Sequence, residues 1–85
     1  MPDIEIYSTR VCPYCVRAKK LIERKGFAYR EIDVSDDEDL RNGMIDRAGG
    51  KRTVPQIFIN NQHIGGCDEL YALESKGGLD PLLKD

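Results

Sequence analysis

Two cysteines separated by two residues form the part of this 85-residue chain with the clearest chemical meaning. Cys12 and Cys15 enclose Pro13 and Tyr14, between a stretch that alternates apolar and polar like a strand and a stretch with helical spacing. The first cysteine of such a pair lies at a helix N-terminus, where unpaired N–H groups and the helix dipole favour negative charge. Thiolate is the reactive form, and such a site lowers a thiol pKa from about 8.5 into the range of roughly 3.5–7.5. We therefore predict that Cys12 is an exposed, activated redox nucleophile and that Cys15, one turn into the helix and more buried, closes a disulfide on it.

Basic residues accompany the cysteine pair along the sequence. Residues 7–30 hold seven Lys or Arg and one acid, whereas residues 31–46 hold seven acids and one Arg. Most of these charges fit solvated helix faces, but Arg10, just before Cys12, is expected to favour the thiolate. The net charge of −2 argues against a dedicated nucleic-acid-binding protein, because such proteins are usually basic.

The sequence has the features of a cytoplasmic protein. No apolar run approaches the roughly 20 residues of a membrane span, and the first residues lack the basic and apolar regions of a signal peptide. Three cysteines are an odd number, which does not suit a secreted disulfide framework. We expect a cytoplasmic protein with one catalytic cysteine pair and one further thiol.

The apolar pattern predicts strands and helices that form one compact α/β domain over residues 1–85. The expected strands are residues 3–8, 28–34, 56–60 and 62–64, with a hairpin turn at Asn60 and Asn61. The expected helices are residues 13–25, a second one that opens with a capping box at 35–38 and ends before Gly49, and residues 67–76, followed by a short turn around 80–83. The side chains expected to be buried on the first two helices are Cys15, Ala18, Leu21, Ile22, Leu40, Met44 and Ala48.

Three short motifs carry a resemblance to a known family. They are Cys12-Pro13-Tyr14-Cys15, Thr53-Val54-Pro55 and Gly65-Gly66-Cys67-Asp68. In this order and spacing the chain resembles the glutaredoxins, and its length and last motif resemble the short bacterial dithiol members. The resemblance implies an α/β, thioredoxin-like fold, with a four-stranded mixed sheet of order 2-1-3-4 flanked by helices and the element order β-α-β-α-β-β-α. It also implies a cis peptide bond before Pro55.

The resemblance implies a glutathione-dependent thiol–disulfide oxidoreductase that reduces protein disulfides and glutathione mixed disulfides. Glutathione would be the reducing co-substrate, and no bound cofactor is expected. Cys12 would attack the substrate, and either a second glutathione or Cys15 would resolve the intermediate. The expected partners are glutathione and disulfide-containing or glutathionylated proteins such as ribonucleotide reductase. We expect a monomer without nucleic-acid or membrane partners.

The resemblance also assigns a glutathione site. Backbone N–H groups of Cys67 and Asp68 would bind the γ-glutamyl carboxylate, and the Asp68 carboxylate would bind the α-amino group. Val54 would pair with the tripeptide through its main chain. The full set of expected contacts is Arg10, Tyr14, Thr53, Val54, Pro55, Gly66, Cys67 and Asp68.

Several assignments stay open at this point. The glycyl carboxylate of glutathione could meet Arg10, Arg52 or Gln56. His63 is expected to face solvent on its strand, and Cys67 is expected to be a small, semi-buried side chain without a required thiol role.

Three alternative functions stay open as well. A zinc site could draw on Cys12, Cys15, His63 and Cys67. An iron–sulfur carrier would share a cluster between two protomers through Cys12 and two glutathiones, although the resemblance implies that Pro13 disfavours it. A redoxin served by thioredoxin reductase would lack glutathione-specific contacts.

Overall fold

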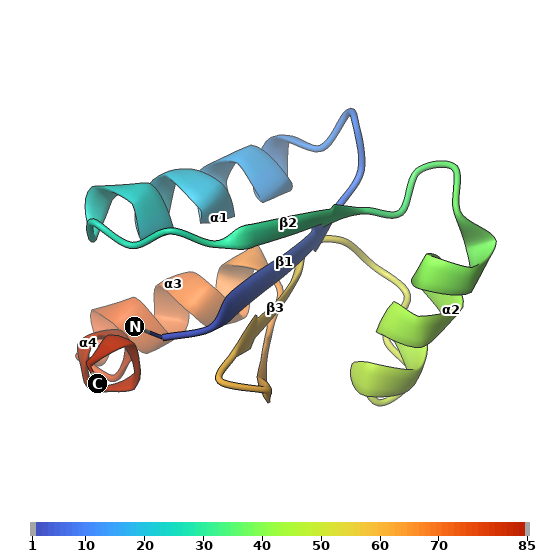
Figure 1. Cartoon of the computed structure of the whole chain (residues 1–85). Helices are drawn as coiled ribbons and strands as arrows, with labels where there is room; N and C mark the ends of the chain where they lie inside the picture. The colour runs from blue at the N-terminus through green and yellow to red at the C-terminus, as the bar shows by residue number, and fades with distance from the viewer. Residues whose placement is uncertain (1, 85) are drawn as a thin grey trace.

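The computed structural model describes residues 2–84 as a four-stranded sheet with helices on both faces (Figure 1). The strand order is β2-β1-β3-β4, with β1 parallel to β2 and the other two pairings antiparallel. This order confirms the predicted arrangement of the sheet. The elements are β1 (Ile4–Ser8), α1 (Pro13–Arg24), β2 (Arg30–Asp33), α2 (Glu38–Arg47), β3 (Gln56–Ile59), β4 (Gln62–Gly65), α3 (Cys67–Ser75) and α4 (Leu79–Leu83).

The main core lies on the face of the sheet that α1, α3 and α4 cover. Alternate residues of a strand point to opposite faces, so Ile4 and Ile6 of β1 and Ile57 and Ile59 of β3 point to this side. The helices contribute the apolar stripe predicted from their spacing, and on α1 the buried residues are Cys15, Ala18, Leu21 and Ile22, as predicted. This packing places the N-terminus of α1 just beyond the end of β1 (Figure 1).

The opposite face of the sheet carries a smaller core and a polar link to α2. Tyr7 and Phe58 pack there with Met44. Arg47, in the last turn of α2, extends over Phe58 with its guanidinium carbon 3.9 Å from the ring centroid. It donates hydrogen bonds of 2.9 Å to the Glu5 carboxylate and to the Tyr7 hydroxyl. The buried carboxylate is therefore paired, and α2 is attached to the sheet through this arginine.

The second helix begins later than predicted. Its N-cap is Asp37, whose Oδ1 accepts a hydrogen bond from the Leu40 N–H at 3.0 Å. Ser35 does not cap the helix, because its hydroxyl accepts the Arg10 N–H at 2.9 Å. The prediction that Leu40 is buried is wrong, since this residue is 43% exposed. The other two positions predicted to be buried on this helix are buried: Met44 and Ala48.

The remaining differences concern the ends of elements. β2 is shorter than the predicted strand at 28–34, because this edge strand pairs only with part of β1. Asn60 and Asn61 have φ angles of 51° and 68°, which confirms the predicted hairpin turn. The expected final turn is a short helix, α4, that buries Leu79 and Leu83. Within residues 2–84, no helix is long and apolar enough to cross a membrane.

Candidate active site

Cys12 and Cys15 lie at the start of α1 and are joined by a disulfide, with Cα atoms 5.2 Å apart. Cys12 is the N-cap of the helix, and its Sγ accepts a hydrogen bond from the Cys15 N–H at 3.1 Å. A donor aimed at this sulfur also favours the thiolate after reduction. Cys15 is buried, whereas Cys12 is only partly buried, which confirms the predicted difference between the two cysteines.

The second motif lies against the first. The bond between Val54 and Pro55 is cis, as predicted, in the loop that leads into β3. The Val54 carbonyl oxygen is 3.9 Å from the Cys12 sulfur, although 42 positions separate the two residues in sequence. Pro55 is buried and Val54 is partly buried, so the loop forms a wall beside the cysteine pair.

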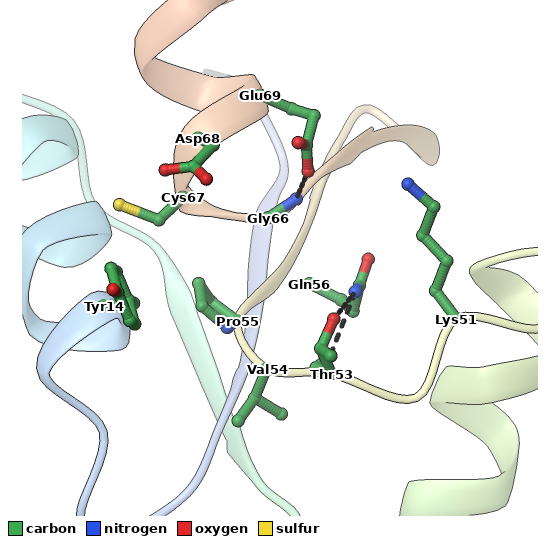
Figure 2. Close-up of a pocket in the computed structure, with 10 residues that line it drawn as sticks. All are labelled: Tyr14, Lys51, Thr53, Val54, Pro55, Gln56, Gly66, Cys67, Asp68 and Glu69. Carbon is green, nitrogen blue, oxygen red and sulfur yellow. Dashed lines mark hydrogen bonds between the residues drawn. The ribbon is translucent and has the colours of Figure 1, made fainter.

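A pocket of about 460 Å³ opens beside this loop (Figure 2). All of the predicted glutathione contacts except Arg10 line it. Tyr14 and Lys51 lie on opposite sides of the pocket in Figure 2. Nothing in the sequence pattern distinguished Lys51 or Glu69 from the other surface charges. The full lining is Tyr14, Lys51, Thr53, Val54, Pro55, Gln56, Gly66, Cys67, Asp68 and Glu69.

The third motif supplies the N-terminus of α3 to the same pocket. Gly66 is the N-cap, and its N–H is already occupied, because it donates to the Glu69 carboxylate at 2.7 Å. The N–H groups of Cys67 and Asp68, in the first turn, have no partner within the helix and are available to an anion. Burial raises the pKa of the Cys67 thiol, and the charges of Asp68 and Glu69 raise it further against the opposing effect of a nearby arginine. The Cys67 thiol is therefore protonated near neutral pH.

Arg10 does not line the pocket. Its guanidinium forms an ion pair with the Asp36 carboxylate, and its backbone N–H donates to the Ser35 hydroxyl. The hydrogen bond to Asp36 raises the pKa of Arg10 and holds the pKa of Asp36 below its usual value. Both side chains are exposed, so the pair contributes little to folding. Asp36 also partly compensates the positive charge that Arg10 brings near Cys12.

Gln56 and His63 form a link that the sequence did not reveal. The Gln56 side chain is 1% exposed, and its amide nitrogen donates to the Thr53 carbonyl at 2.9 Å and to the Thr53 hydroxyl at 3.2 Å (Figure 2). His63 Nε2 is 2.7 Å from Gln56 Oε1. The expectation that His63 faces solvent is wrong: its ring is partly buried and packs on Phe58, with 5.0 Å between the ring centroids. Burial lowers the His63 pKa, and so does the charge of Lys51.

These contacts bear on two assignments that the sequence left open: the partner of the glycyl carboxylate and the zinc site. Both ends of the Gln56 amide bind groups inside the protein, so this side chain is not free to receive a carboxylate. Arg52 is exposed and does not line the pocket. Among residues 2–84, no three His, Cys, Asp or Glu side chains converge to hold a metal ion, and His63 bonds to Gln56 rather than joining the cysteines.

Comparison with known proteins identifies the family. The sequence model of the glutaredoxins matches residues 4–64. Glutaredoxin 3 of Escherichia coli K12 is 55% identical over 84 residues, which span 99% of this chain and 100% of that protein. The chain belongs to the glutaredoxin family. A probable glutaredoxin of Synechocystis is 54% identical over 80 residues, which span 94% of this chain and 91% of the relative.

Solved glutaredoxins share the fold. The buckwheat glutaredoxin–glutathione complex has a TM-score of 0.87 at 34% identity and covers 96% of this chain and 76% of that one. The solution structure of a Brucella melitensis glutaredoxin has a TM-score of 0.84 at 55% identity, with coverages of 96% and 88%. As a glutaredoxin with a Cys12–Cys15 pair, the chain is a thiol–disulfide oxidoreductase, and its thioredoxin-like fold is confirmed.

Proposed function

We propose that this glutaredoxin reduces glutathione mixed disulfides and protein disulfides in the cytoplasm, with glutathione as its reducing co-substrate. The observation that carries the proposal is the place of the Cys12 sulfur, at a helix N-terminus beside Val54 and next to a pocket of about 460 Å³. A glutathione complex of a buckwheat relative supports the choice of ligand. We further propose a monomer with one domain over residues 1–85, acting on proteins such as ribonucleotide reductase.

The pocket carries groups that complement glutathione, which has two carboxylates and one ammonium group. The N–H groups of Cys67 and Asp68 would bind the γ-glutamyl carboxylate, and the Asp68 carboxylate would bind the ammonium group. The main chain of Val54 would pair with the cysteinyl residue. Lys51, on another wall of the pocket, is a better placed partner for the glycyl carboxylate than Arg10. Tyr14, which is 55% exposed, would cover the tripeptide.

Reduction of a glutathionylated protein would begin at Cys12. Its thiolate attacks the glutathionyl sulfur, the old disulfide breaks, and the protein sulfur leaves as a thiolate that takes a proton from water. A second glutathione thiolate then attacks the glutathionyl sulfur bound to Cys12. The products are glutathione disulfide and the regenerated Cys12 thiolate. One free glutathione is consumed, and its sulfur replaces the protein sulfur as the partner of the glutathionyl sulfur, so the sequence is two successive disulfide exchanges.

Reduction of a protein disulfide would also use Cys15. Cys12 attacks one sulfur of the substrate and forms a mixed disulfide with it, while the other sulfur leaves as a thiolate. Cys15 then loses its proton and attacks the Cys12 sulfur, which releases the second substrate sulfur and closes the Cys12–Cys15 disulfide. Two glutathione molecules reduce that disulfide in turn. The disulfide in the structure corresponds to this oxidised form.

An assay of wild type and two single variants tests the proposal. Turnover of a glutathionylated peptide and of a protein disulfide is followed with glutathione and glutathione reductase as the electron supply. We expect Cys12→Ser to lose both activities, and Cys15→Ser to keep the first and lose the second. Equal loss of both activities in a folded Cys15→Ser variant would contradict the two routes. Turnover with thioredoxin reductase but not with glutathione would contradict the choice of reductant.

A further inference from the structure

The peptide unit between Thr53 and Val54 is held from behind by one buried side chain. Gln56 Nε2 donates to the Thr53 carbonyl oxygen at 2.9 Å, and the Gln56 side chain lies inside the protein. In a trans peptide the carbonyl and the following N–H belong to one plane and point in opposite directions. Fixing the Thr53 carbonyl toward Gln56 therefore aims the Val54 N–H away from Gln56.

The Gln56 amide can take only one orientation. Thr53 offers a carbonyl oxygen, which only accepts, so the Gln56 NH₂ group must face it and Gln56 Oε1 must face His63. Gln56 Oε1 in turn needs a donor, so His63 carries a proton on Nε2. The neutral Nε2–H form supplies that donor, and so does the doubly protonated ring. Packing of the His63 ring on Phe58 holds it in place.

We propose that Gln56 and His63 are positioning residues for substrate binding: His63 orients the Gln56 amide, and that amide fixes the Thr53–Val54 peptide so that the Val54 N–H faces the substrate. This inference rests on the proposed main-chain pairing of Val54 with glutathione. Residues 51–54 belong to neither a helix nor a strand, so no ladder of backbone hydrogen bonds holds this peptide. The Gln56 side chain, held by His63 of β4, fixes this peptide instead.

The test compares the KM of Gln56→Met with the KM of Gln62→Met, a control variant that carries the same substitution at an exposed position of β4. With a glutathionylated cysteine peptide as the probe, Gln56→Met should raise KM by roughly three- to tenfold, in line with the loss of one hydrogen bond. Its kcat and the rate of Cys12 alkylation should stay at the wild-type value, because the cysteine itself is untouched. An unchanged KM, or a parallel change in Cys12 alkylation, would overturn the proposal.

The link through His63 has its own test. His63→Phe keeps the packing on Phe58 and removes the donor, so it should raise KM less than Gln56→Met does and should fold even if that variant does not. Added to Gln56→Met, it should raise KM no further, because its effect passes through the same amide. If the two substitutions raise KM independently, so that their effects multiply in the double variant, His63 does not act through Gln56 and this part of the proposal is overturned. Nitrogen NMR signals that place the proton of neutral His63 on Nδ1 would overturn it as well.

These outcomes are distinguishable from a failure of the proposed function. If glutathione is not the substrate, the wild-type protein will not turn over the glutathionylated peptide at all. If only the positioning role is wrong, wild type and Gln56→Met will turn it over with the same KM. Thermal melts of each variant, run in parallel, confirm that the compared proteins are folded.

Discussion

Two helices of this glutaredoxin begin with a cysteine near the same pocket, and the two cysteines have opposite surroundings. Cys12 caps α1, is partly exposed, and has no acidic residue in the first turn behind it. Cys67 opens α3, is 5% exposed, and is followed directly by Asp68 and Glu69. The first site favours a thiolate, whereas the second raises the pKa of its thiol.

The comparison shows that a helix N-terminus does not by itself activate a cysteine. Both sulfurs lie where a helix dipole favours negative charge. At α3, burial and two adjacent carboxylates outweigh the dipole, and the free N–H groups of that turn are left for an external anion. At α1, the Cys15 N–H is directed at the Cys12 sulfur itself. One helix start is therefore suited to chemistry and the other to binding.

Replacing Cys12 and Cys67 one at a time should show the largest difference between the two helix starts. Cys12→Ser should reduce turnover of a glutathionylated peptide to background, because the two remaining cysteines, Cys15 and Cys67, are buried. Cys67→Ala keeps its backbone N–H and should retain most of the activity. The glutathione-coupled assay measures both, and substantial turnover by a folded Cys12→Ser protein would contradict the assignment of the nucleophile.

Neutralising Asp68 should change both the binding of glutathione at the start of α3 and the pKa of the Cys67 thiol. Asp68→Asn removes the negative charge that we propose pairs with the glutathione ammonium group, and it should raise KM by about tenfold, as expected for the loss of a charge-assisted hydrogen bond. It should also lower the pKa of the Cys67 thiol, because a nearby negative charge is lost. Steady-state kinetics and a titration of thiolate absorbance in a Cys12→Ser/Cys15→Ser background measure the two effects. A raised Cys67 pKa would contradict this explanation.

The buried thiol should also make stability depend on pH. In the oxidised protein Cys12 and Cys15 do not titrate, so Cys67 is the cysteine that responds. Above about pH 8.5 the unfolded chain loses this proton and the folded protein keeps it, so stability should fall as pH rises toward the raised Cys67 pKa, by up to ~1.4 kcal/mol per pH unit. Urea unfolding between neutral and alkaline pH measures the slope. An identical slope in Cys67→Ala would exclude this contribution.

An acid placed on α1 should make its start resemble that of α3. Val16 is 44% exposed in the first turn, so Val16→Glu adds a negative charge near the Cys12 sulfur with little effect on packing. A negative charge close to a thiol disfavours the thiolate, so this substitution should raise the Cys12 pKa. The pH profile of Cys12 alkylation should shift upward relative to Val16→Gln. Coincident profiles for the two variants would show that the first turn does not control this thiol.

The sequence predicted best those features that depend on local spacing. The four buried residues of α1 follow from helical periodicity, and the different burial of Cys12 and Cys15 follows from their positions along one turn. The strand order and the cis bond at Pro55 came from the family resemblance, since no local pattern specifies them. The functional roles of the individual site residues stay predictions, as does the single-domain boundary at 1–85.

The wrong predictions arose where distant segments meet. The predicted start of the second helix was wrong, and Arg10, from another loop, donates its N–H to the Ser35 hydroxyl there. Leu40 was predicted to be buried together with Met44 and Ala48, yet it is 43% exposed. His63 was expected in solvent, because its contact with Gln56 depends on how β3 pairs with β4. Lys51 was missed for a similar reason, because its place in the pocket lining depends on the path of the loop before β3.

The most direct test is to titrate Cys12 in the reduced protein, by thiolate absorbance or by alkylation rate, with Cys67 replaced by Ala so that one signal dominates. We predict that Cys12 is ionised at neutral pH, with a pKa well below that of a free cysteine. An ionisation like that of an exposed, unperturbed thiol would contradict the central claim that the start of α1 activates this sulfur.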